Sequence, residues 1–152
     1  MGGFGSGRRG WRPKQEDCRA IDVNRMHRDG CLRPGYSGRW YWTVDDEEIA
    51  SIRFAAESKR VVLDYRYRFR GGDWESVEEP VPLTWTDCHL GGRRPWFLCP
   101  GVRDGRHCGR RVCKLYSGGR YFLCRHCYNL AYQCQSENEM DRLCRRADKR
   151  RA

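Results

Sequence analysis

The sequence has no long apolar run. No segment approaches the roughly 20 consecutive apolar residues that a membrane-spanning helix requires, so we expect no membrane partner. The opening residues also lack the apolar core of a secretory signal peptide. Together these absences predict a soluble protein of the reducing cytoplasm.

Motifs for catalysis are missing as well. The sequence contains no paired-carboxylate motif, no nucleophile beside a general base and no phosphate loop. We therefore expect neither an enzyme nor a small-molecule substrate. A metal-dependent nuclease built on His89 or His126 with acidic residues stays open as an alternative, although no residue spacing requires it.

Lysine is scarce in a strongly basic chain. Of the 30 basic residues 26 are Arg and four are Lys, and the net charge is +10. Arginine offers a rigid planar fork for phosphate, base edges or carboxylates, whereas lysine does not, although a GC-rich genome would produce the same bias. Residues 1–40 carry nine basic and four acidic side chains, residues 41–92 carry six and eleven, and residues 93–152 carry fifteen and five. Basic ends around an acidic middle favour a polyanionic partner such as nucleic acid.

Cysteine, in contrast, is abundant. Ten cysteines without an export signal indicate metal ligands and free thiols, because a secreted disulfide scaffold would need that signal. Two cysteine pairs in tight turns at the ends of short hairpins predict a tetrahedral zinc thiolate site, and the four residues are Cys99, Cys108, Cys124 and Cys127. We predict one structural Zn²⁺ here. Four thiolates form a closed set without the open position that a catalytic zinc keeps.

Two neighbouring residues compete with this ligand set. Cys113 lies inside an alternating strand pattern and is interpreted as a packing residue. His107 offers a nitrogen beside Cys108, but the Cys108–Gly109 turn favours the thiol. The insert 101–107 lengthens the first cysteine turn. The half of the site formed by Cys99 and Cys108 is therefore less sharply defined.

A second metal site has weaker support. Cys88 and His89 precede the predicted ribbon, but two more ligands would be needed. Cys18, His27 and Cys31 are available, and their spacing shows no ligand pattern. The role of Cys88 and His89 stays open.

The chain divides into four expected segments. These are a flexible Arg/Gly arm at 1–13, a helix plus antiparallel sheet at 14–92, a zinc ribbon at 93–132 and a basic amphipathic helix at 136–152. The predicted fold class is therefore α+β. A short helix is expected within 15–35, with Asp22 as its N-cap and Gly30 as its stop. No convincing second helix follows that would make a helix-turn-helix.

Period-two alternation predicts an antiparallel meander of four strands. The expected strands are 38–44, 49–56, 60–69 and 74–85. In the third strand one apolar face, which must pack on the helix or the ribbon, should be shared by Val61, Leu63, Tyr65, Tyr67 and Phe69. Pro80 and Pro82 place the last strand at an edge or a bulge. Three shorter strands are expected in the ribbon, at 95–98, 110–116 and 120–123.

Three segments of the chain are distinctive: the opening MGGFGSGRRGW, the segment TDCHLGGRRPWFLCP and the run CGRRVCKLYSGGRYFLCRHCYNLAY. In these segments the chain resembles a group of uncharacterised bacterial proteins from phages, plasmids and integrated elements. The resemblance covers most of the chain and implies a bacterial cytoplasmic setting and a mobile-element role. It implies the same four ribbon ligands and leaves Cys113, Cys134 and Cys144 outside the motif. It implies no particular function.

These observations predict a non-catalytic zinc-ribbon protein that binds DNA or RNA mainly through phosphate contacts. The expected contact residues are Arg8, Arg9, Arg12, Arg110, Arg111, Arg120, Arg125, Arg142, Arg145, Arg146 and Arg150. An alternative is a protein-binding adaptor or inhibitor of host machinery that uses acidic residues of the middle segment. Those residues are Asp45, Asp46, Glu47, Glu48, Glu75, Glu78 and Glu79.

Overall fold

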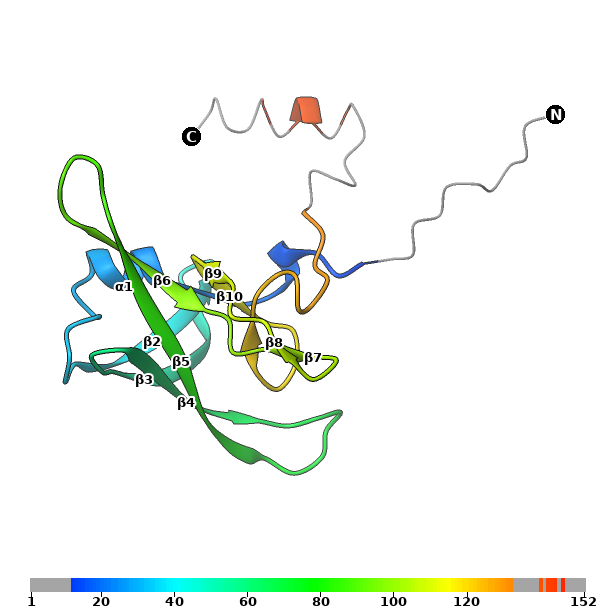
Figure 1. Ribbon diagram of the computed structural model, residues 1–152. Coiled ribbons are helices and arrows are strands. Elements are labelled where there is room, and N and C mark those ends of the chain that lie inside the picture. The colour runs from blue at the N-terminus through cyan, green and yellow to red at the C-terminus, as the bar shows by residue number, and fades with distance from the viewer. Residues whose placement is uncertain (1–11, 133–139, 141, 145, 147–152) are drawn as a thin grey trace.

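A computed structural model describes residues 12–132, 140, 142–144 and 146 of the chain (Figure 1). In chain order the elements are η1 (Gln15–Asp17), β1 (Ala20–Asp22), α1 (Val23–Arg28), β2 (Ser37–Val44), β3 (Glu47–Ala56), β4 (Arg60–Tyr67), β5 (Glu75–Asp87), β6 (Arg93–Leu98), β7 (Val102–Arg103), β8 (Arg106–His107), β9 (Arg111–Val112), β10 (Lys114–Ser117) and β11 (Phe122–Leu123). The described part is therefore mostly antiparallel β-sheet. The predicted α+β class is not confirmed, because α1 spans only six residues.

The largest sheet has six strands in the order β2-β3-β4-β5-β6-β9. Its first four strands form the antiparallel meander that the alternating sequence predicted. The long strand β5 then pairs with β6, and β6 pairs with β9. Hydrogen bonding thus continues across the segment boundary expected at 92–93.

Helix α1 begins and ends where the sequence predicted. The Asp22 carboxylate accepts hydrogen bonds from the backbone N–H groups of Asn24 and Arg25, at 2.9 and 3.3 Å. Gly30 adopts a φ of +70° just after the helix. The N–H of Gly30 donates to the His27 carbonyl and the N–H of Cys31 to the Met26 carbonyl, so the last turn closes as a Schellman motif.

The two prolines of β5 lie where the strand has only one partner. Val62 pairs with Pro80 and Arg60 with Pro82 on the β4 side. On the other side β6 pairs with β5 only from Leu83 onward. The prolines, which have no N–H to donate, therefore lie beyond the β5–β6 ladder, as an edge position requires.

A second sheet joins the N-terminal segment to the cysteine-rich region. Its order is β1-β10-β11, and Ile21 pairs with Leu115 in antiparallel register. Further toward the N-terminus, the Gln15 N–H donates to the Ala131 carbonyl at 3.0 Å. The small sheet therefore holds the cysteine-rich region close to the start of α1.

The core lies between the apolar face of the large sheet, α1 and the cysteine-rich region, as the sequence predicted. The Trp42 and Phe122 rings stack with centroids 6.1 Å apart, and Tyr65 meets Phe122 edge-on at 5.3 Å. Cys99 and Cys124 belong to the same buried cluster. The prediction that Phe69 lies on the apolar face of this strand is wrong, because β4 ends at Tyr67 and the Phe69 side chain is 65% exposed.

Two predicted segments fall mostly outside the described residues. The arm at 1–13 is described only at positions 12 and 13. In the segment 136–152 the described residues are Met140, Arg142–Cys144 and Arg146, which have helical conformation and are exposed. No helix among the described residues is long and apolar enough to cross a membrane.

Candidate metal centre

Four thiols converge in the cysteine-rich region, and they belong to the four predicted ligands. The sulfurs of Cys99 and Cys127 lie 3.7 Å apart, and those of Cys108 and Cys124 lie 3.8 Å apart. All four sulfurs lie within 4.8 Å of one another. A tetrahedron with Zn–S bonds of about 2.3 Å has S···S edges of about 3.8 Å. The cluster is therefore tetrahedral-like and able to hold a metal ion.

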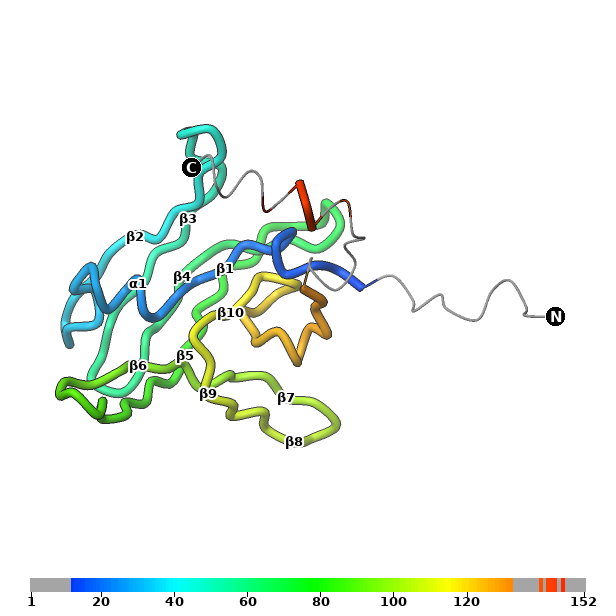
Figure 2. Tube along the Cα trace, turned by 90° about the horizontal axis from the view of Figure 1, so that it is seen from above, coloured from blue at the N-terminus to red at the C-terminus, as the bar shows by residue number. Residues whose placement is uncertain are grey.

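The first cysteine turn contains a small hairpin. The Cys108 N–H donates to the Gly101 carbonyl at 2.7 Å, and the Gly109 N–H donates to the Cys99 carbonyl at 3.1 Å. These bonds close the turn around the insert, which forms the hairpin β7–β8 (Figure 2). Without residues 102–107 the chain would read Cys-Pro-Gly-Cys-Gly. The Cys99 and Cys108 sulfurs thus lie within 4.8 Å of each other in spite of the intervening residues.

The second cysteine turn runs from Cys124 to Cys127, and it contacts the first turn through a sulfur atom. The Cys124 N–H donates to the Cys99 sulfur at 3.3 Å, and Cys99 and Cys124 are both fully buried. Gly101 allows this approach, because a Cβ at that position would lie 2.7 Å from the Cys127 sulfur. The outer pair, Cys108 and Cys127, is half-buried.

The thiols cannot all lose their protons easily without a cation. Hydrogen bonding from the Cys99 thiol lowers the pKa of Cys124 to about 4. The same contact raises the pKa of Cys99. Burial raises the pKa of Cys127 to about 11. A divalent cation at the centre would favour the fully deprotonated set, because it offsets both the burial and the mutual repulsion.

The competing ligands lie outside this cluster. Cys113 accepts a contact from the Arg94 guanidinium at 3.3 Å, and its carbonyl accepts from the Val23 N–H at 3.0 Å. His107 lines the surface beside Cys108 without joining the four sulfurs. Among the described residues, no other group of three or more candidate ligands comes together.

Basic side chains surround the outer face of the cluster. We call this surface the knuckle groove; it has a volume of about 500 Å³. Its lining consists of Arg103, Asp104, Arg106, His107, Cys108, Arg110, His126 and Cys127. The Cys99 N–H donates to the Arg110 carbonyl at 3.0 Å, so Arg110 is anchored directly to the cluster.

Arg103 and Arg106 were not among the residues predicted from the sequence. They occupy β7 and β8, on either side of the turn Asp104–Gly105. An Asp-Gly pair is a strong hairpin signal, so the insert could have been interpreted as a basic hairpin. Its extension away from the large sheet is visible in Figure 2.

The arginines predicted to contact nucleic acid differ in whether their side chains already interact with other residues of the protein. Arg110 and Arg111 are exposed and have no ion pair within the described residues. Arg120 pairs with Glu75 at 2.6 Å. Arg125 donates to the Leu130 carbonyl at 3.3 Å and lies 4.4 Å from the Tyr132 ring centroid. Arg12, Arg142 and Arg146 are exposed, whereas Arg8, Arg9, Arg145 and Arg150 lie outside the described residues.

Several acidic residues of the middle segment are engaged within the protein. Glu79 is only 4% exposed, and its carboxylate accepts hydrogen bonds from the Phe122 N–H. Glu48 pairs with Arg39 at 2.9 Å. Asp45 and Asp46 form the turn between β2 and β3 with positive φ angles.

No protein-family model, curated protein or solved structure matches the chain.

Proposed function

We propose that the protein is a non-catalytic zinc-ribbon protein that binds nucleic acid. One zinc ion, bound by Cys99, Cys108, Cys124 and Cys127, would serve as a structural staple. The observation that carries the proposal is the basic knuckle groove around the four thiols. Three arginines and two histidines line that groove against a single acidic residue, Asp104.

The metal's role in this proposal is to hold the basic groove in shape. The insert that carries Arg103 and Arg106 lies between the ligands Cys99 and Cys108, and Arg110 lies two residues after Cys108. Zinc bound to four thiolates contributes folding free energy without an open coordination position. The chain's own arginines would then supply the phosphate contacts, as rigid forks of positive charge.

Duplex DNA is the simplest probe of phosphate binding by the groove. We expect binding of a labelled duplex to weaken steeply between about 50 and 200 mM salt, because each phosphate contact releases counterions. In an Arg106→Ala/Arg110→Ala variant the slope of log affinity against log salt should fall in magnitude by about two. Fluorescence polarisation of the labelled duplex measures both quantities.

A matched control removes the same charge elsewhere. Arg60 pairs with Glu57 at 2.6 Å, and Arg93 pairs with Asp87 at 3.6 Å. The double variant Arg60→Ala/Arg93→Ala should keep the slope of the unaltered protein. Equal losses in the two double variants would contradict a localised groove. A zinc-loaded, folded protein that binds no nucleic acid but copurifies with one protein would favour the adaptor alternative.

A further inference from the structure

Strands β3 and β4 separate and leave a cleft between them. Their pairing runs only from Ala56↔Val61 to Arg53↔Asp64. Beyond that point β3 continues against β2, and β4 continues against β5 as far as Tyr67. The opening holds a cavity of about 820 Å³, within the range of small-ligand sites, which we call the fork cleft.

Aromatic rings from three elements line the inner part of the cleft. Trp42, Tyr65 and Phe122 contribute to it and pack on one another. The Trp42 indole N–H donates to the Ala20 carbonyl at 2.8 Å, so its polar atom is already satisfied. The Tyr65 hydroxyl lies 2.7 Å from a Glu79 carboxylate oxygen. Phe122 is only 4% exposed, so the half-buried Trp42 and Tyr65 offer the apolar surface of the cleft, with their polar atoms already engaged.

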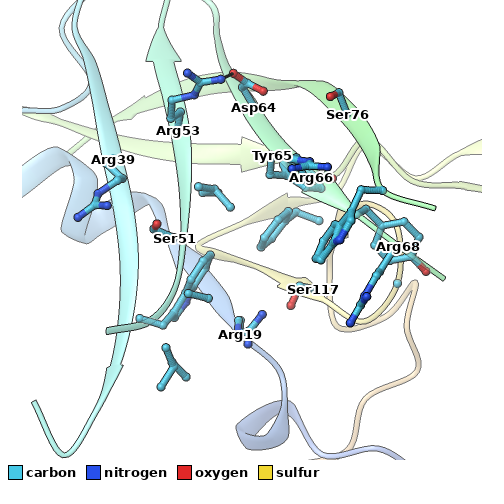
Figure 3. A pocket seen from close by; sticks show the side chains of 18 residues that line it. Arg19, Arg39, Ser51, Arg53, Asp64, Tyr65, Arg66, Arg68, Ser76 and Ser117 are labelled. Carbon is cyan, nitrogen blue, oxygen red and sulfur yellow. Dashed lines mark ion pairs between the residues drawn. The ribbon is translucent and has the colours of Figure 1, made fainter. Parts of the chain in front are cut away.

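The walls of the cleft are strongly basic. Five arginines line it against one acidic side chain, Asp64, and they are Arg19, Arg39, Arg53, Arg66 and Arg68 (Figure 3). Two of these have acidic partners, since Arg53 pairs with Asp64 at 2.7 Å and Arg39 pairs with Glu48. The other three have no ion pair within the described residues. Guanidinium groups of like charge around one cavity favour an anion between them.

Trp74 adds an exposed ring at this basic wall. Its side chain is 52% exposed, and it also lines the cleft. The Arg66 and Arg68 guanidinium carbons lie 5.3 and 4.8 Å from the centroid of the ring. An exposed aromatic ring beside arginines combines the two elements of a single-strand site, a surface on which an unpaired base stacks and positive charge for its phosphate.

We propose that the fork cleft binds a nucleotide unit, with its base against the aromatic rings and its phosphate at Arg66 and Arg68. This inference deepens the proposed function and rests on it. The unit would belong to a single strand rather than a duplex, because only unpaired bases expose their faces and edges to such a cleft. The knuckle groove would bind backbone phosphates of either form.

The test uses a labelled oligothymidine of about 12 nucleotides and the zinc-loaded full chain. Trp74→Ala should weaken binding at least about fivefold, because stacking on one base alone accounts for that much. Arg68→Ala should also weaken binding, because it removes a phosphate contact. The exposed Trp74 and Arg68 can be truncated without opening the core. Arg94→Ala is the matched control, because Arg94 also lies over a tryptophan ring, 4.3 Å from the Trp96 centroid, and outside the fork cleft.

Two competitors distinguish the source of the ligand. Competition by thymidine monophosphate would assign the cleft to free nucleotides, and its failure to compete would assign it to a strand segment; either supports the cleft. Equally strong competition by polyglutamate of matched charge would overturn the proposal, because it would show binding by charge alone.

Failure of this inference can be told apart from failure of the proposed function. If Trp74→Ala and Arg68→Ala leave strand binding unchanged while Arg106→Ala/Arg110→Ala weakens duplex binding, the cleft proposal is wrong and the proposed function stands. If the folded protein binds neither probe, both are wrong.

Discussion

At the scale of single residues, Glu79 stands out because its side chain is buried in the core. No other acidic side chain among the described residues is buried. Glu79 lies on the core face of β5, between Val77 and Val81. The Tyr65 hydroxyl is 2.7 Å from both a Glu79 carboxylate oxygen and the Arg120 carbonyl oxygen, but a phenol has one proton to donate. A protonated Glu79 satisfies both contacts, because it can donate to Tyr65 while Tyr65 donates to Arg120. Burial also raises the pKa of Glu79.

The raised pKa of Glu79 predicts a pH dependence of stability. Because the pKa of Glu79 is raised in the folded state, its favourable contribution is complete below the unfolded pKa of about 4.3 and declines as the pH rises through the folded pKa. Glu79→Gln keeps the contacts without ionising, so its stability relative to the unaltered protein should increase over that interval, at no more than about 1.4 kcal/mol per pH unit. Denaturant unfolding of zinc-loaded protein at several pH values measures this difference. A constant difference would contradict a raised pKa of Glu79 in the folded protein.

Gly101 predicts a sensitivity of the metal centre to one methyl group. A Cβ there would lie 2.7 Å from the Cys127 sulfur and 3.4 Å from the Cys99 sulfur. Gly101→Ala should therefore push the ligands apart and lower zinc affinity by about 10- to 100-fold, the usual effect of disturbing a ligand's immediate support. Competition with a chromophoric chelator gives the affinity. An unchanged value would show that the cluster can relax around the methyl group.

Residue-scale prediction succeeded where a single residue type sets the local geometry. Asp22 and Gly30 could be assigned to the ends of α1, because an N-cap needs a short acceptor side chain and a left-handed C′ position favours a residue without Cβ. The convergence of the four cysteines could be predicted because tight turns permit few geometries. Phe69 was placed wrongly because alternation continues past the point where β4 stops pairing. Glu79 gave no signal, since a charged residue in a strand normally predicts the solvent face.

At the scale of elements, the hairpin β7–β8 is an insertion within a cysteine turn. Val102 pairs with His107, so the two ends of the hairpin are side by side. Deleting residues 102–107 should leave a CxxC turn that still binds one zinc, while removing Arg103 and Arg106 weakens duplex binding. Zinc content and polarisation of the deletion variant test the two parts separately. Loss of zinc would show that the hairpin shapes the cluster rather than projecting from it.

Strand pairing was less predictable than strand existence. The four strands of the meander were predicted from alternation, but alternation assigns faces and does not choose partners. The continuation from β5 to β6 and β9 therefore went unpredicted, and so did the pairing of β1 with β10. The fork cleft depends on where the β3–β4 ladder ends, at Arg53↔Asp64, so its five arginines were not recognised as lining one cavity.

At the scale of the whole molecule, the four-cysteine cluster is part of the core rather than an appendage. Cys99 and Cys124 lie in the same buried cluster as Phe97, Leu115 and Phe122. Structural zinc in small domains contributes an apparent 10–16 kcal/mol, which is about the whole stability of a typical domain at roughly 5–15 kcal/mol. Chelation should therefore abolish the near-ultraviolet circular dichroism of the packed aromatic rings, and zinc should restore it. Spectra that do not change on chelation would contradict this coupling.

The zinc content of the purified, folded chain tests the central claim most directly, and a count of alkylated cysteines completes the measurement. The account predicts one zinc per chain, with Cys99, Cys108, Cys124 and Cys127 protected from alkylation while the exposed Cys88 reacts. It also predicts that Cys108→Ser lowers the zinc content. Folded protein that contains no zinc, with those four thiols as reactive as Cys88, would contradict it.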